Sequence, residues 1–244
     1  MDFYVHNLKL SQDGLNCIGF INADWGRLKM MKERHFIDEL IIDGRPIHGV
    51  LFDMDGTLLD SGGAVASSWK RWSERTGVSF MAIMEYSHGR PARDTIQFFA
   101  PNRDFEVELQ WLLSYEMKDD EGIAPIPGIH AFLQRLRLPW TIVTSASAHL
   151  ARHRLHVADL PIPDRIVTVE DVRRGKPDPE GYLLGAEALG VPIENCVVIE
   201  DSPIGIEAGT RAGAQVIAIT TTFPAGRFAK NYIIRDYHEL LRVL

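Results

Sequence analysis

Two aspartates one residue apart, Asp53 and Asp55, follow the apolar run 49–52 and precede Gly56. Residues i and i+2 of an extended chain project to the same side, so both carboxylates can face one site. Two like charges held this close repel each other unless a cation or a shared proton relieves them. Mg²⁺ is a hard cation that prefers oxygen ligands. The pair therefore suggests metal-assisted chemistry on an anionic substrate, with one aspartate acting as the nucleophile.

Residues 53–56 also fit a plain turn, because the Asp side chain can accept hydrogen bonds from nearby backbone amides and Gly adopts unusual dihedral angles. On the dipeptides alone, a turn is the commoner explanation. A calcium-binding loop would need further oxygen ligands at fixed offsets and a closing Glu. Leu58 and Leu59 are apolar where such ligands should continue, which excludes the calcium loop. The meaning of the aspartate pair therefore depends on what the rest of the chain places beside it.

The composition predicts a folded protein with a buried core. With 244 residues and 45% hydrophobic content, the chain can bury the core of one large domain or two small ones. The net charge is −7, from 26 basic and 33 acidic residues, and gives no support for a nucleic-acid partner. A small phosphorylated substrate stays compatible, because the local field at a site matters more than net charge.

Cysteine usage and hydropathy predict a cytoplasmic protein. Only Cys17 and Cys196 occur, and their spacing indicates neither a disulfide framework nor a zinc site. The first residues lack the basic and apolar regions of a signal peptide. No run approaches the roughly 18 apolar residues of a membrane helix, so no membrane association is expected.

From residue 47, short apolar runs alternate with helical stretches, which is typical of a parallel sheet. The predicted fold is therefore α/β, with a doubly wound, Rossmann-like parallel sheet as its core. The expected strands cover residues 49–52, 140–144, 165–167, 196–199, 215–219 and 232–234, and the expected helices cover 128–137, 147–157, 179–189 and 203–212.

Residues 62–127 break that alternation. They predict helices at 64–76, 92–99 and 105–118 and no strand. A helical insertion directly after the aspartate loop would sit over it as a cap, and such lids exclude water and select substrates. The predicted division is an N-terminal extension of unknown role (1–46, with a possible amphipathic helix at 29–40), a core (47–61 and 128–244) and a cap (62–127).

Three further polar groups follow predicted strands, at the edge where parallel sheets bind ligands. Ser145, Ala146 and Ser147 follow the strand 140–144, Lys176 lies on a Pro-rich turn before a helix, and Glu200 and Asp201 follow the strand 196–199. Taken singly, each group has a structural explanation: a serine N-cap, a solvated lysine, or acids that favour a helix N-terminus. Four compatible groups, each at a strand end, are unlikely to coincide.

In this order and spacing the chain resembles the haloacid dehalogenase superfamily of phosphohydrolases. The resemblance covers residues 47–244 and leaves the extension unexplained. The four motifs stand here as Asp53-Met-Asp55-Gly-Thr57, Thr144-Ser145-Ala-Ser, Gly175-Lys176-Pro-Asp-Pro and Glu200-Asp201-Ser-Pro.

The resemblance implies a role for each motif residue. Asp53 would attack phosphorus and form an aspartyl-phosphate. Asp55 would protonate the leaving alcohol and then activate the hydrolytic water. Mg²⁺ would be held by Asp53, the backbone carbonyl of Asp55 and Asp201, with Glu200 close by or acting through water. The carbon–halogen hydrolases of the superfamily lack an acid at the position of Asp55, so its presence excludes that reaction.

The remaining groups would bind the substrate. Ser145, the backbone amide of Ala146 and Lys176 would hold the phosphoryl oxygens. The cap string 87–95 resembles that of the glycerol-phosphatase, 2-deoxyglucose-6-phosphatase and sugar-phosphatase group, which implies a small phosphorylated sugar or polyol as substrate. Arg93 would reach from the cap toward the polar or anionic part of that substrate, although an exposed arginine on a cap helix is the alternative.

Two other functions stay open. β-Phosphoglucomutases share the fold, the motifs and a comparable cap arginine, but carry a histidine shortly after the first motif. Residues 61–66 contain no histidine, which favours hydrolysis over isomerisation. A non-catalytic phospho-binding regulatory module would usually have lost one motif, and this chain keeps all four. A monomer or weak dimer is expected.

Overall fold

A six-stranded parallel sheet lies at the centre of the larger part of the molecule. The computed structural model describes residues 8–9, 36–228 and 232–243. The strand order is β11-β10-β9-β4-β7-β8, and each neighbouring pair is parallel. All six predicted strands are confirmed to within one residue at each end; they are β4 (Gly49–Phe52), β7 (Trp140–Val143), β8 (Ile166–Val167), β9 (Cys196–Glu200), β10 (Gln215–Ile219) and β11 (Tyr232–Ile234).

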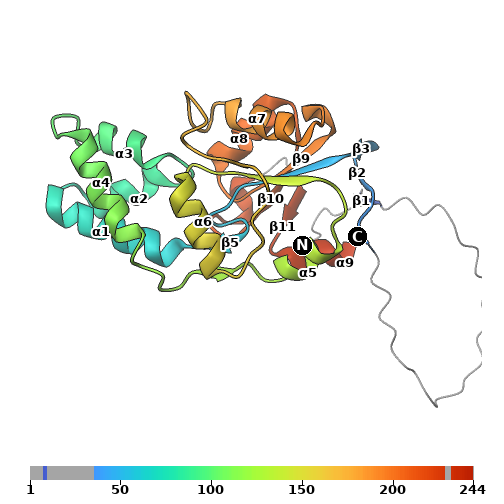
Figure 1. Cartoon of the computed structure of the whole chain (residues 1–244), viewed down its shortest axis with the longest axis horizontal. Helices are drawn as coiled ribbons and strands as arrows, with labels where there is room; N and C mark the ends of the chain where they lie inside the picture. The colour runs from blue at the N-terminus through green and yellow to red at the C-terminus, as the bar shows by residue number, and fades with distance from the viewer. Residues whose placement is uncertain (1–7, 10–35, 229–231, 244) are drawn as a thin grey trace, which may run out of the picture.

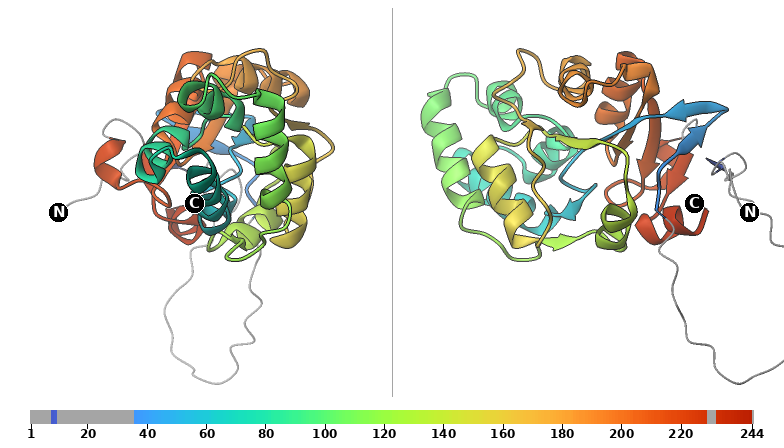
Figure 2. Two further views of the ribbon diagram at one scale, coloured as in Figure 1. Left: turned by 90° about the vertical axis from the view of Figure 1, so that its left-hand side faces the viewer. Right: turned by 45° about the vertical axis from the view of Figure 1, so that its right-hand side comes forward.

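Helices cover both faces of this sheet (Figures 1 and 2). Helices α7 (Glu180–Leu189) and α8 (Pro203–Ala212) lie on one face, and α5 (Ile129–Arg135), α6 (Ala148–Val157) and α9 (Tyr237–Val243) on the other. The central strand β4 is buried along its whole length, as expected for a strand covered on both sides.

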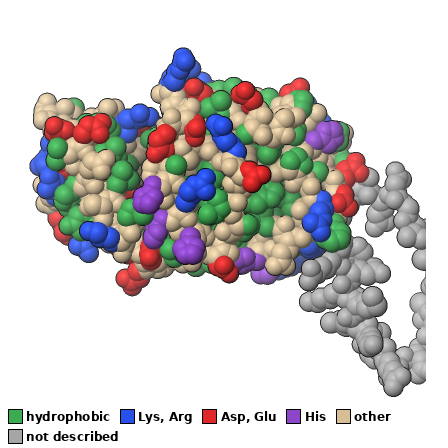
Figure 3. Space-filling model, viewed as in Figure 1, with side chains coloured by type: hydrophobic (Ala, Val, Ile, Leu, Met, Phe, Trp, Pro, Cys, Tyr) green, Lys and Arg blue, Asp and Glu red, His purple; other side chains and the backbone are tan. Residues whose placement is uncertain are grey.

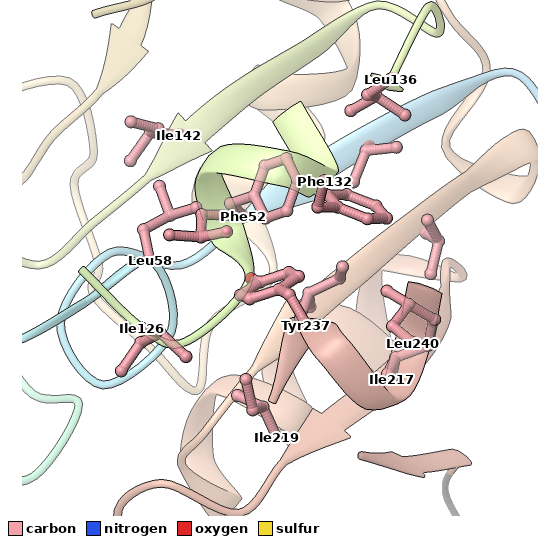
Figure 4. Packing of buried hydrophobic residues seen from close by; sticks show 14 of the residues in the cluster. Phe52, Leu58, Ile126, Phe132, Leu136, Ile142, Ile217, Ile219, Tyr237 and Leu240 are labelled. Atoms are coloured by element: carbon pink, nitrogen blue, oxygen red, sulfur yellow. The ribbon is translucent and has the colours of Figure 1, made fainter. Parts of the chain in front are cut away.

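Alternate residues of β4 supply the two cores. Phe52 packs on the side of α5 and α9, with ring centroids 6.2 Å from Phe132 and 6.3 Å from Tyr237 (Figure 4). Leu51 points to the other face, where it joins Tyr182 of α7. The strand that carries the aspartate pair is therefore anchored from both sides.

The segment before β4 contributes to the core, which differs from the expectation for residues 1–46. Strands β2 (Leu40–Ile42) and β3 (Arg45–Ile47) form an antiparallel hairpin, paired in turn with β1 (Leu8–Lys9). Asp43 and Gly44 have positive φ at its two-residue turn. Ile37, Leu40, Ile42 and Ile47 are fully buried in the main cluster.

The amphipathic helix expected at 29–40 is wrong for the part that the structure describes. Residues 36–39 are not helical and Leu40 begins a strand, while 29–35 lie outside the described residues. Ile37 and Leu40 have a helical spacing, but Leu40 and Ile42 follow the two-residue period of a hairpin.

The smaller part of the molecule is a four-helix cap. It contains α1 (Gly62–Thr76), α2 (Phe80–Ser87), α3 (Ala92–Phe99) and α4 (Phe105–Glu116), and three of these were predicted. The cap has a core of its own, formed by Trp69, Trp72, Ile83, Ile96 and Leu112. Two short strands, β5 (Leu59–Asp60) and β6 (Ala124–Pro125), pair antiparallel where the chain enters and leaves the cap.

Two 3₁₀ turns, Ile193–Asn195 and Ala225–Arg227, complete the described elements. In the described part of the chain, the helices are too short or too polar to cross a membrane.

Candidate active site

The predicted site residues meet because of the strand order. Strand β4 lies between β7 and β9, so the carboxyl ends of these three strands adjoin. Asp53 follows β4, Thr144 follows β7, and Glu200 ends β9. The chain first builds the sheet outward from β4 through β7 and then returns to the other side of β4 with β9, which is the switch point where open sheets bind ligands.

Lys176 joins the acidic groups from the loop before α7. Its Nζ donates hydrogen bonds to Asp53 Oδ1 and, across 2.7 Å, to Glu200 Oε1. All three side chains are buried, so the alternative of a solvated lysine is wrong. Burial lowers the pKa of Lys176, but the carboxylates of Asp53 and Glu200 outweigh burial, and the pKa stands well above its ordinary value.

Glu200 is held in place at both oxygens. Besides Lys176, Oε1 accepts from the hydroxyl of Tyr182 at 3.1 Å, and Oε2 accepts from Ser202 N at 2.8 Å and Ser202 Oγ at 2.9 Å. A Cβ at Gly205 would lie 1.6 Å from Oε1, so only glycine leaves room for this carboxylate. Tyr182 and Ser202 were not predicted as site residues.

Three buried carboxylates could hold a metal ion. Among the described residues, oxygens of Asp53, Glu200 and Asp201 lie within 4.8 Å of one another. Burial raises the pKa of Asp201 well above its usual range, and the nearby carboxylates of Glu200 and Asp53 raise it more. Burial also raises the pKa of Asp53 to about 7, against the lowering effect of Lys176. Lys176 offsets part of this negative charge, and an all-oxygen set with a surplus of charge suits Mg²⁺.

Gly56 makes room for Asp201. Its φ is 81°, and a Cβ there would lie 2.1 Å from Asp201 Oδ2. The glycine that suggested a plain turn is therefore required twice, by the backbone conformation and by the close carboxylate.

Asp55 is fixed through one oxygen. Its Oδ1 accepts from Ser61 Oγ at 2.6 Å and from Arg154 Nη1 at 2.9 Å. The Asp55 side chain keeps 28% of its surface exposed, while Arg154 is buried. Neither partner was predicted. One signal was available: Arg154 lies seven residues after Ser147 on a predicted helix, which is about two turns and hence the same face.

The predicted phosphate donors lie at the site but have protein partners. Ser145 Oγ donates to the carbonyl of Gly89 in the cap at 2.9 Å, and Ala146 N donates to Thr144 Oγ1 at 3.0 Å. Ser147 caps α6, since its side chain accepts from Leu150 N at 3.3 Å. The N-cap explanation of Ser147 is therefore confirmed.

A cavity of about 460 Å³ lies between core and cap, in the usual size range of ligand pockets. Asp53, Asp55 and Asp201 line its core side. Arg93 lines its cap side, 38% exposed, with Nε 3.7 Å from Asp94 Oδ1. The apolar part of the cap wall is formed by Val65, Trp69, Met84, Phe105, Leu109 and Leu113.

The face of the molecule in Figure 3 shows Lys and Arg interspersed with Asp and Glu over both core and cap. Charge of one sign does not gather on that face. The acidic groups that matter for chemistry are instead those buried at the cavity floor.

The chain is similar to several known proteins and solved structures. Residues 50–219 match the family described as haloacid dehalogenase-like hydrolase. Hexitol phosphatase A of Escherichia coli is 42% identical over 201 residues, which cover 80% of this chain and 92% of that protein. Glycerol-1-phosphate phosphohydrolase 1 of Saccharomyces cerevisiae is 33% identical, over 81% of this chain and 85% of the relative. The crystal structure of a hydrolase from Pseudomonas syringae superposes with a TM-score of 0.72 at 26% identity, covering 80% of this chain and 96% of that one.

Proposed function

Since the chain belongs to the haloacid dehalogenase-like hydrolases, we propose that it is a phosphatase of small polyol and sugar phosphates. One observation carries the proposal: Asp53, paired with Lys176, and Asp55 lie together on the floor of a cavity closed by a cap. The substrate class is supported by relatives named for hexitol, glycerol-1-phosphate and 2-deoxyglucose-6-phosphate.

In the first step, a carboxylate oxygen of Asp53 attacks phosphorus. The new bond joins Asp53 to phosphorus, and the bond from phosphorus to the ester oxygen breaks with its electron pair on that oxygen. Asp55 gives its proton to this oxygen, and the free alcohol leaves. Lys176 stabilises the negative charge of Asp53 and of the phosphoryl group during transfer.

In the second step, Asp55 acts in the opposite sense. It is now ionised and accepts a proton from water, whose oxygen attacks phosphorus of the aspartyl-phosphate. The bond between phosphorus and Asp53 breaks, releasing inorganic phosphate and restoring both carboxyl groups. The hydrogen bonds from Ser61 and Arg154 to Asp55 Oδ1 leave Oδ2 to exchange the proton.

The carboxylates of Asp53 and Asp201 and the backbone carbonyl of Asp55 would hold Mg²⁺. When bound, the ion would neutralise charge on the phosphoryl group and the surrounding carboxylates. Glu200 would add its charge to the site from a fixed position, because its two oxygens already accept four hydrogen bonds from Lys176, Tyr182 and Ser202.

Ser145, the amide of Ala146 and Lys176 would bind phosphoryl oxygens, and Arg93 would contact the rest of the substrate. For Ser145 and Ala146 this requires exchange of the partners that they have in this structure. We also propose a core at 47–61 and 128–244 with the cap at 62–127, supported by the paired β5 and β6 at the junction; the hairpin before residue 47 adds its buried side chains to that core. A monomer or weak dimer in the cytoplasm completes the proposal.

The test is phosphate release from hexitol, glycerol and sugar phosphates with Mg²⁺, measured for the wild type and for Asp53→Asn. Release by the wild type alone supports the proposal and ranks the substrates. Release by both variants would remove Asp53 as nucleophile. If neither releases phosphate, isomerisation of β-glucose 1-phosphate is the next reaction to assay, and its occurrence would replace the phosphatase proposal.

A further inference from the structure

Arg154 is a buried cation with unused donors. It lies on α6 of the core, is 3% exposed and lines the cavity. Its Nη1 donates to Asp55 Oδ1, but Nε and Nη2 are buried and have no hydrogen-bond partner among the described residues. Leaving donors of a charged group unpaired in a buried place is costly, so a group that enters the cavity is the natural partner for them.

Glu116 faces Arg154 from the cap. It ends α4, is 6% exposed and also lines the cavity. Its Oε1 lies 3.9 Å from Arg154 Nη2, which is too long for a hydrogen bond. Nη2 has almost no accessible surface here, so an oxygen atom enters only when Arg154 and Glu116 move slightly apart; it could then accept from Nη2 and donate to Oε1. A hydroxyl group has both capacities, and a phosphate or carboxylate oxygen lacks the proton to donate.

The position of this pair is set by Asp55. Asp55 protonates the oxygen of the leaving alcohol in the proposed reaction, so the carbon chain of that alcohol begins beside it. Arg154 is bonded to Asp55, whereas the phosphoryl-binding Lys176 is bonded to Asp53. The carboxylates of Asp55 and Glu116 flank the guanidinium and disfavour a second anionic group there.

We propose that Arg154 and Glu116 recognise a hydroxyl group of the leaving alcohol, and so select polyol phosphates over unsubstituted alkyl phosphates and bisphosphates. This inference rests on the proposed phosphatase function and specifies its substrate class. Because Arg154 belongs to the core and Glu116 to the cap, the hydroxyl contact is complete only when the two parts meet. Both residues are thus specificity determinants, and Arg154 also positions Asp55.

The experiment compares kcat/KM for a hexitol phosphate and n-butyl phosphate in the wild type, Arg154→Lys and Glu116→Gln. Both esters release an alkoxide that needs a proton, so a change that acts only through Asp55 would affect them equally. Arg152→Lys on the exposed face of α6 and Glu74→Gln on the exposed face of α1 are matched controls. Circular dichroism checks that each variant is folded.

The wild type should prefer the hexitol ester, and each cavity variant should reduce this preference about 10-fold or more, as expected when a buried polar group loses its substrate hydroxyl. The control variants should retain the preference. Equal losses on both esters, or an unchanged preference, would overturn the inference. Should Arg154→Lys fail to fold, Glu116→Gln alone decides, because Glu116 has no hydrogen bond to Asp55 in the structure.

Binding separates this inference from the proposed function. Calorimetric titration of Asp53→Asn with hexitol phosphate and with n-butyl phosphate measures recognition without turnover. Tighter binding of the hexitol ester that disappears with Glu116→Gln supports the pair even if the wild type hydrolyses neither ester. Equal binding of the two esters would contradict the pair while leaving a phosphatase intact.

Discussion

Glu200 Oε1 and Lys176 Nζ form a buried ion pair with a separation of 2.7 Å. Breaking such a pair leaves a buried charge without its partner, which is strongly destabilising. Tyr182 and Ser202 hold the carboxylate, and the carboxylate directs the lysine toward Asp53. Tyr182 and Ser202 therefore influence Asp53 without touching it, through Glu200 and then Lys176.

Asp53→Asn should reduce phosphate release by at least about 10³-fold, because an amide cannot form the acyl-phosphate bond. Burial raises the pKa of the Asp53 carboxyl to about 7. The substitution puts a neutral amide of the same shape in its place. The fold should therefore persist, with a thermal midpoint close to that of the wild type. Steady-state assays and thermal unfolding measure the two quantities, and retained turnover would contradict the nucleophile assignment.

Gly205→Ala should damage the site from a distance. The new Cβ would lie 1.6 Å from Glu200 Oε1, so the carboxylate must leave its position. Lys176 then loses the hydrogen-bond partner that orients it toward Asp53. We expect about a 10-fold or larger loss of kcat and roughly 1–3 kcal/mol of destabilisation, as for an overpacked core. Gly226→Ala is the control, since among the described residues no atom beyond its chain neighbours lies within 4 Å of the added Cβ. Similar behaviour of the two variants would mean that Glu200 is not held as described.

Ser61→Ala removes one of the two hydrogen bonds to Asp55 Oδ1. We expect kcat to fall several-fold for polyol phosphates, whose alkoxide needs the proton of Asp55. The fall should be smaller for p-nitrophenyl phosphate, which has a better leaving group. Ser114→Ala, on the exposed side of α4, controls for loss of a hydroxyl. A uniform fall on both substrates would argue against a role in proton transfer.

Mg²⁺ affinity should increase with pH below about pH 7. Burial raises the pKa of Asp53 to about 7 and raises that of Asp201 well above its usual range, so both groups hold a proton more readily than free aspartates do. A metal ion must displace these protons, so each proton released gives about a tenfold change in apparent Kd per pH unit. Titrations of activity with Mg²⁺ between pH 5.5 and 8.5 measure this. Activity that survives excess EDTA would contradict the metal proposal itself.

Arg93→Ala should raise KM or lower kcat for sugar and polyol phosphates more than for an aryl phosphate. Arg93 lines the cap wall of the cavity, and within the described part of the chain its acidic neighbour is Asp94, at 3.7 Å. Arg71→Ala, on the exposed face of α1, serves as a control. Equal effects on both kinds of substrate would indicate that Arg93 does not contact the leaving group.

The sheet could be predicted because its strands are apolar on both faces and short, and each lies between helical periods. The run 49–52 has no polar residue to place in water, so a covered parallel strand is its natural structure. Helix α9 was missed because its sequence alone did not indicate burial. Its apolar residues Tyr237 and Leu240 are buried by packing in the core cluster that contains Phe52 and Phe132. Helix α2 (80–87) was missed because it is apolar at most positions, so it lacks the separation of polar and apolar faces that α3, of the same length, shows.

In the site too, some residues could be predicted from the sequence and others could not. The motif residues could be located because strand ends converge by topology, whichever side chains surround them. Glu116 and Arg154 reach the site from helices, and Ser61 from the residue just before α1; the sequence alone does not show how these elements are placed relative to one another. The expectation that the segment before residue 47 lies outside the core failed for the same reason: Ile37 and Ile42 are buried by partners distant in sequence.

The hydroxyl of Ser145 carries a single proton, and in this structure it is shared with the carbonyl of Gly89 in the cap. A phosphoryl oxygen has no proton of its own to give at neutral pH once it is dianionic, so it would need that same donor. The hydroxyl of Ser145 can therefore donate either to the carbonyl of Gly89 or to a phosphoryl oxygen, but not to both at once. In the proposed reaction, binding of the ester would therefore break this hydrogen bond to the cap, and departure of phosphate would allow it to form again.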